Sequence, residues 1–168
     1  MTERKANPVE NRKNLWGKLR EPHSHAQVAS ISVGLGAAIG LGVGAAIWAS
    51  QPFRLIGLYI AFLGLFHFLE YLTTAMHRHD VGINSFVLDH SPQYHFAMAF
   101  GFVEYYIEAF FWPEFKQLDW ITLPAVAIVL FFQIIRSLAM VTAGANFTHL
   151  IAFKKEDNHV LVTDGIYK

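Results

Sequence analysis

Several ionisable side chains lie inside long apolar stretches of this sequence, and five of them are the groups best placed to do chemistry there. They are His67, Glu70, Glu104, Glu108 and Arg136. A charged side chain within a membrane is costly, so such residues usually line functional sites or pair with one another. The spacing predicts that His67 and Glu70 share one helix face, and that Glu104 and Glu108 share another. The residues therefore favour either a polar site in a helix bundle or ion pairs that hold the bundle together.

Arg136 lies one turn after Gln133 in the fourth apolar stretch. A lone arginine at membrane depth would cost several kcal/mol, so it needs an acidic partner. We expect Arg136 to pair with Glu104 or Glu108.

The sequence does not favour a metal site or the common nucleophile and phosphate motifs. His23 and His25, and also His77 and His79, are spaced by two, but neither pair forms part of an HExxH pattern. The GxSxG, GxGxxG and P-loop patterns are absent. With no cysteine in the 168 residues, a disulfide scaffold and a cysteine-ligated zinc site are excluded as well.

The elements that carry the ionisable groups must be membrane helices. The chain is 54% hydrophobic and only 15% charged, whereas about a quarter of the residues of a soluble domain are charged. Its 13 basic residues balance its 13 acidic ones, so no net charge attracts nucleic acid. Four apolar runs approach or exceed the roughly 20 residues that a membrane helix needs, and they span 26–50, 53–76, 94–112 and 120–141.

These runs predict an all-α, polytopic integral membrane helix bundle with about four transmembrane helices. They are too long and too continuous for the strands of a membrane barrel. The bundle would occupy residues 26–143, between a polar arm at 1–25 and a short tail at 144–168. The arm carries six Lys and Arg residues, which predicts a cytosolic N-terminus, and four spans return the tail to the cytosol.

Small residues mark one face of the first run. Gly36, Gly40 and Gly44 are spaced by four, so they would let another helix approach closely. This face could join two copies as a homodimer, although a glycine-rich span without a specified partner explains the pattern equally well.

The tail combines polar and aromatic residues directly after the fourth run. Asn146 to His149 read N-F-x-H, and residues 159–167 form an apolar, extended segment with a predicted turn at Asp164-Gly165. Composition alone would allow a small hairpin at the membrane surface.

Taken together, five blocks of the sequence resemble the isoprenylcysteine carboxyl methyltransferases. The blocks are LGLFHFLEYLTTA (63–75), NSFVLDHSPQY (84–94), EYYIEAFFWPEFK (104–116), RSLAMVTAGANFTHLI (136–151) and HVLVTDGIY (159–167). The resemblance implies a multi-pass enzyme of the endoplasmic reticulum membrane. It would use S-adenosylmethionine to methylate the C-terminal carboxylate of prenylated cysteine in CaaX proteins, with membrane lipid as its surroundings.

The resemblance also implies which residues bind the methyl donor. They are Ala152, His159, Val160, Leu161, Val162 and Tyr167, with Ala152 standing where relatives place a polar residue. The five ionisable residues of the apolar runs would serve as structural or substrate-tunnel residues.

The match stops at Lys168, before an Arg-His-Pro block and a terminal helical hairpin that complete the family's donor pocket. We therefore expect residues 1–168 alone to bind S-adenosylmethionine weakly or not at all. The alternative function is a non-catalytic membrane protein that keeps the family's first helices.

Overall fold

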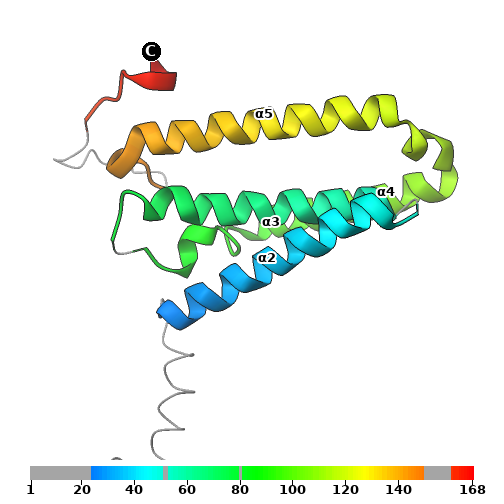
Figure 1. Cartoon of the computed structure of the whole chain (residues 1–168), viewed down its shortest axis with the longest axis horizontal. Helices are drawn as coiled ribbons and strands as arrows, with labels where there is room; N and C mark the ends of the chain where they lie inside the picture. Colours follow the sequence, from blue (N-terminus) through cyan, green and yellow to red (C-terminus); the bar gives the residue numbers. More distant parts are fainter. Residues whose placement is uncertain (1–23, 51–52, 80, 150–159) are drawn as a thin grey trace, which may run out of the picture.

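The computed structural model describes residues 24–50, 53–79, 81–149 and 160–168. All the regular secondary structure in these residues is helical (Figure 1). The long helices are α2 (His25–Trp48), α3 (Phe53–Ala75), α4 (Pro92–Phe111) and α5 (Asp119–Ala143). Short 3-10 helices follow α3, α4 and α5: η1 (Ile83–Phe86) comes after α3, η2 (Pro113–Gln117) after α4, and η3 (Gly144–Asn146) and η4 (Gly165–Tyr167) after α5. Each of the four apolar runs thus forms a helix, which confirms the predicted all-α bundle.

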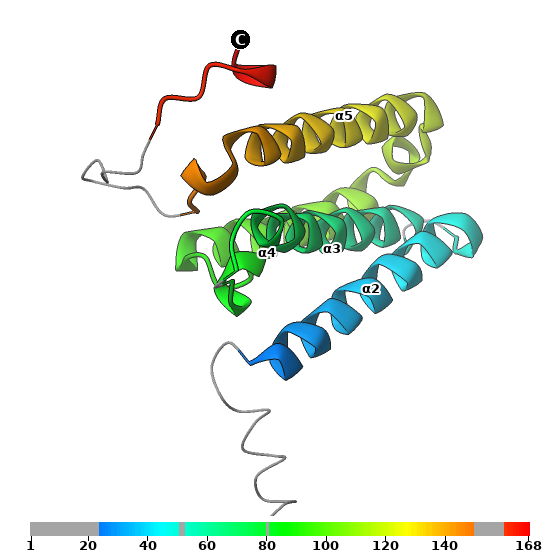
Figure 2. The ribbon, with the colours of Figure 1, turned by 60° about the vertical axis from the view of Figure 1, so that its left-hand side comes forward.

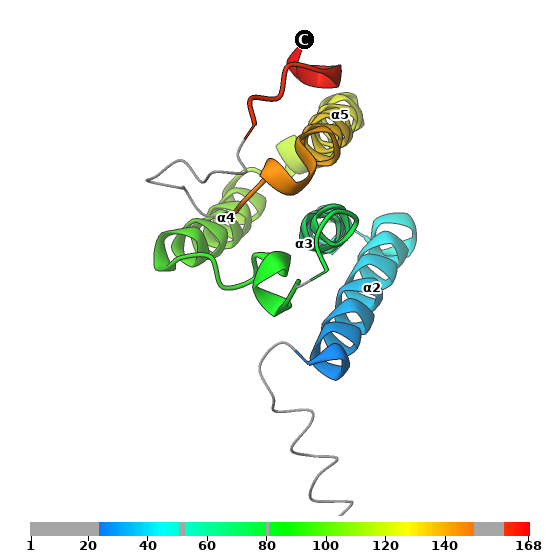
Figure 3. The ribbon, with the colours of Figure 1, turned by 90° about the vertical axis from the view of Figure 1, so that its left-hand side faces the viewer.

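Helix α3 lies at the centre of the bundle. Seen along the bundle in Figure 3, α2, α4 and α5 are arranged around it. Helix α2 crosses α3 at an angle, whereas the axes of α3, α4 and α5 are nearly parallel (Figures 1 and 2). Helix α3 therefore faces all three of the other long helices. A polar side chain on α3 can thus be buried and can reach partners on its neighbours.

Glycine makes the approach of α2 to α3 unusually close. A Cβ atom at Gly42 would lie 2.5 Å from the Gly57 carbonyl oxygen, and one at Gly57 would lie 2.6 Å from the Gly42 carbonyl oxygen. A Cβ atom at Gly36 or Gly40 would meet nothing within 4 Å. The close contact within the chain thus uses a different face of α2 from the one that carries Gly36 and Gly40, and the homodimer stays a prediction.

Polar side chains are buried in the bundle, and large apolar side chains cover much of its outside. Among the described residues the buried side chains include His67, Glu70 and Thr73 of α3, while large apolar side chains of α4 and α5 are exposed. Phe131 and Phe132, for example, are 58% and 61% exposed. An apolar exterior of this kind suits lipid and not water.

Within the described residues, three segments are long and apolar enough to cross a membrane, and the chain is a multi-pass membrane protein. They are His25–Trp48, Phe53–Ala75 and Asp119–Asn146. Helix α4 runs alongside them but carries Glu104 and Glu108, which lower its hydropathy.

Candidate functional site

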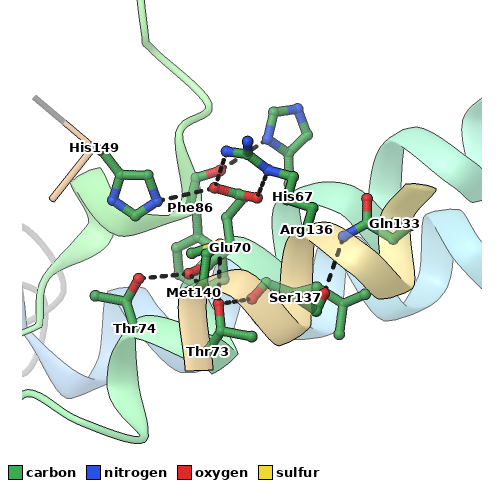
Figure 4. Close-up of polar contacts among 11 residues, drawn as sticks. His67, Glu70, Thr73, Thr74, Phe86, Gln133, Arg136, Ser137, Met140 and His149 are labelled. Carbon is green, nitrogen blue, oxygen red and sulfur yellow. Dashed lines mark hydrogen bonds and ion pairs between the residues drawn. The ribbon is translucent and has the colours of Figure 1, made fainter. Parts of the chain in front are cut away.

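A carboxylate on α3 forms the centre of the polar interior (Figure 4). The side chain of Glu70 has no exposed surface, yet three nitrogen atoms surround it. From α5, Arg136 donates through Nε to Oε1 at 2.6 Å and through Nη2 to Oε2 at 2.9 Å. From the chain beyond α5, His149 places its Nε2 atom 3.0 Å from Oε2. The three residues, which we call the Glu70 cluster, satisfy both oxygens of the buried carboxylate.

The predicted pairing of Arg136 with Glu104 or Glu108 is wrong. Helix α5 packs against α3, so its arginine reaches the acid on that helix. Glu108 instead pairs with Lys116, which lies in the turn after α4, and Glu104 is exposed. Sequence spacing showed which acids share a face, but not which helix that face would meet.

His67 forms a second polar contact one turn before Glu70, from the same helix. Its Nδ1 atom lies 2.8 Å from the backbone oxygen of Phe86, and its Nε2 atom lies 3.1 Å from the hydroxyl of Tyr94. Because the carbonyl can only accept, the neutral ring must donate from Nδ1 and accept at Nε2 from the tyrosine. His67 therefore ties α3 to both η1 and the start of α4.

The η1 segment packs against α3 through the side chain of Phe86. Phe86 has no exposed surface, and its ring stacks on that of Tyr71 at 4.2 Å between centroids. The next residue, Val87, has φ 58° and ψ 23°, a left-handed conformation that β-branched residues rarely adopt. This strained residue ends η1 directly after the carbonyl that His67 binds.

The residues predicted to bind the methyl donor fall on the tail, and only part of them can be placed. Ala152 and His159 lie outside the described residues. Val160 and Leu161 are 71% and 85% exposed, and Val162 is half-buried. Tyr167 donates its hydroxyl to the Ala139 carbonyl at 3.3 Å.

Two further contacts hold the tail against η3 and the last turn of α5, and one turn shapes the tail itself. The Val160 amide donates to the Oδ1 atom of Asn146 at 3.0 Å. The predicted turn at Asp164-Gly165 is confirmed, since the Tyr167 amide donates to the Asp164 carbonyl at 3.0 Å. Gly165 has φ +56°, and a Cβ atom there would lie 3.0 Å from Thr142 of α5. Residues 160–168 contain no β-strand, so the described part of the tail does not form a hairpin.

The role of His149 in the Glu70 cluster was missed from the sequence. The N-F-x-H pattern drew attention to the segment, but a histidine six residues after a helix gives no sign of the acid that it meets. Glu70 is 79 positions earlier in the chain, and only the packing of α5 on α3 brings the two together.

A separate apolar cavity of about 160 Å³ lies between α3 and α4. Its lining residues are Leu55, Ile56, Tyr59, Gly101, Phe102 and Tyr105. The Tyr59 hydroxyl contacts Met98 Sδ at 2.9 Å, and the Tyr59 and Phe102 rings meet edge to face. None of the predicted site residues lines this cavity.

Comparisons with known proteins agree on one family. The model of the isoprenylcysteine carboxyl methyltransferase (ICMT) family matches residues 125–168. A protein-S-isoprenylcysteine O-methyltransferase of Dictyostelium discoideum is 46% identical over 120 residues, which are 71% of this chain and 50% of that protein. The enzyme of the same name from Xenopus laevis is 41% identical over 142 residues, which are 84% of this chain and 49% of that protein.

A solved structure has the same fold. It is described as the eukaryotic intramembrane Ras methyltransferase ICMT, and it superposes with a TM-score of 0.81 at 30% identity. The superposition covers 96% of this chain and 62% of the solved one. The chain spans about half the length of the curated relatives it matches.

Proposed function

We propose that this chain, which belongs to the isoprenylcysteine carboxyl methyltransferase family, forms the membrane part of an enzyme that methylates the C-terminal carboxylate of prenylated cysteine. The methyl donor is S-adenosylmethionine, and the substrates are prenylated CaaX proteins. The observation that carries the proposal is the agreement of 96% of this chain with a solved intramembrane methyltransferase at a TM-score of 0.81.

Methyl transfer to a prenylated substrate suits a site at the end of a membrane helix bundle, where lipid meets water. S-adenosylmethionine supplies an electrophilic methyl group, and the substrate carboxylate is already ionised, so no strong base is needed. The protein has to position the reactants and exclude water. The prenyl group is apolar and belongs in lipid, whereas the donor is polar and comes from the aqueous phase. The tail lies against the last turns of α5, where a span ends.

The residues that we propose for donor binding are those of the tail, namely Ala152, His159, Val160, Leu161, Val162 and Tyr167. Ala152 and His159 belong to this set but lie outside the described residues. The exposed side chains of Val160 and Leu161 leave an apolar surface that an adenine or ribose face can cover. Tyr167 adds an aromatic ring that is 48% exposed. The Glu70 cluster and His67 are fully engaged within the bundle, so we assign them a structural role in this proposal.

The proposed environment is the endoplasmic reticulum membrane, with both ends of residues 1–168 in the cytosol. The open face at Gly36 and Gly40 would let α2 of a second copy approach, and chemical cross-linking in membranes would test this dimer.

We expect glycosylation tags to report this topology. A tag inserted in the loop at 49–53 or 113–119 should be modified, because both loops face the lumen if all four helices cross. A tag in the 77–93 loop or after Lys168 should stay unmodified. Modification of the tail tag would show that one of the helices, most simply α4, does not cross.

Donor binding is the test of the function itself. Ultraviolet cross-linking of radiolabelled S-adenosylmethionine to membranes that contain the full gene product should label the protein. S-adenosylhomocysteine should compete for the label, whereas ATP should not. Labelling that neither compound reduces, or no labelling at all, would favour a non-catalytic membrane protein.

A further inference from the structure

The Glu70 cluster joins three parts of the chain that are far apart in sequence. Glu70 belongs to α3, Arg136 to α5 and His149 to the segment that leaves α5 (Figure 4). Arg136 alone already binds both carboxylate oxygens. Arg136 therefore suffices to neutralise Glu70, and the consequence of the His149 bond is structural: it ties the segment after α5 to α3.

That consequence concerns the direction in which the chain leaves α5. Gly144 breaks the helix with φ +55°, and the short turn η3 follows. Asn146 then donates from Nδ2 to the Ala143 carbonyl at 3.2 Å and accepts the Val160 amide on Oδ1. Three residues later His149, whose side chain is only 15% exposed, is held against the buried carboxylate. Asn146 and His149 thus fix both ends of the short segment from which the tail departs.

We propose that the bond between His149 and Glu70 positions the tail, so that these two are positioning residues for methyl-donor binding. The carboxylate is buried on α3, the helix around which the other long helices are arranged (Figure 3). Through His149 it fixes the point at which the chain leaves the bundle, ahead of residues 160–167, which dock on α5 and η3 through Ala139, Thr142 and Asn146. This inference rests on the proposed function for its kinetic consequence, but its structural part can be tested without any activity.

The structural test uses the absence of cysteine from residues 1–168. A Cβ atom at Gly165 would lie 3.7 Å from the Thr142 Cβ atom, within the range of about 3.5–4.5 Å that disulfides require. In the variant Thr142→Cys/Gly165→Cys, mild oxidation should join the tail to α5. The left-handed backbone at position 165 disfavours any side chain there, but this cost is the same in every background compared.

We expect His149→Ala to slow this cross-linking at least fivefold in membranes, because the chain that leads into the tail is then no longer anchored at residue 149. His149→Gln should restore most of the rate, since its amide can still donate to Glu70. His79→Ala, at an exposed histidine outside the Glu70 cluster, is the matched control and should leave the rate unchanged. Equal cross-linking rates in all four backgrounds would overturn the proposal.

The kinetic test uses the full gene product and a farnesylcysteine analogue. His149→Ala should raise the KM for S-adenosylmethionine at least fivefold, with the KM for the farnesylcysteine analogue changed less than twofold, and His149→Gln should reverse most of the effect. A general loss of folded protein would lower the maximal rate and leave both KM values unchanged. That outcome would count against a positioning role. If wild-type protein transfers no methyl group, the proposed function fails, and the cross-linking result still decides whether His149 positions the tail.

Discussion

Replacing Arg136 with leucine should cost the bundle about 3 kcal/mol of stability, measured by thermal unfolding in detergent micelles. The substitution leaves the fully buried Glu70 carboxylate with His149 as its one remaining partner in the Glu70 cluster. Breaking a buried pair from one side typically costs about 3–5 kcal/mol. The lower end applies because the Arg136 side chain is 45% exposed.

Two further variants make this prediction specific. In Glu70→Leu/Arg136→Leu no charge of the pair stays buried, so the double variant should recover part of the loss. Arg54→Leu removes an exposed ion pair in which Arg54 Nη1 lies 3.3 Å from Asp119 Oδ1. This variant should lose less than about 1 kcal/mol of stability. If Glu108→Leu rescued Arg136→Leu better than Glu70→Leu does, the pairing described above would be wrong.

Gly57→Ala should lower the stability of the bundle by about 1–3 kcal/mol, the usual cost of overpacking a tight contact. The new methyl group would lie 2.6 Å from the Gly42 carbonyl oxygen and 2.7 Å from the Ala45 Cβ atom. The first of these is backbone, so α2 and α3 would have to move apart.

The matched control for Gly57→Ala is Gly40→Ala, where the methyl group meets nothing within 4 Å. Here the higher helix propensity of alanine should raise stability by up to about 1 kcal/mol. The two variants should thus shift the unfolding temperature in opposite directions. A shift of the same sign and size in both would show that α2 and α3 do not meet through Gly42 and Gly57.

The helices could be predicted closely because each depends on local properties of the chain. Apolar runs of sufficient length specify membrane helices whatever their neighbours are. The third helix begins two residues earlier than its apolar run, since Ser91 caps it and Pro92 occupies its first turn. That signal is also local, and it is the usual chemistry of a helix start.

The partners of the polar groups could not be predicted, because they depend on how the helices pack. Spacing placed His67 and Glu70 on one face of a helix, yet they bind different elements: His67 reaches η1 and α4, and Glu70 reaches α5 and His149. The contact between Gly42 and Gly57 could not be predicted from the sequence either. Gly36 and Gly40 show the regular spacing, but Gly42 makes the contact because its face of α2 meets α3.

The formation of a carboxyl methyl ester tests the central claim most directly. Membranes that contain the full gene product would be incubated with radiolabelled S-adenosylmethionine and either an S-farnesylated cysteine analogue or the same analogue without the farnesyl group. The account predicts label on the farnesylated compound alone, released as volatile methanol by mild base as a methyl ester should be. Equal methylation of both compounds, or none of the farnesylated one beyond that of membranes lacking the protein, would contradict it.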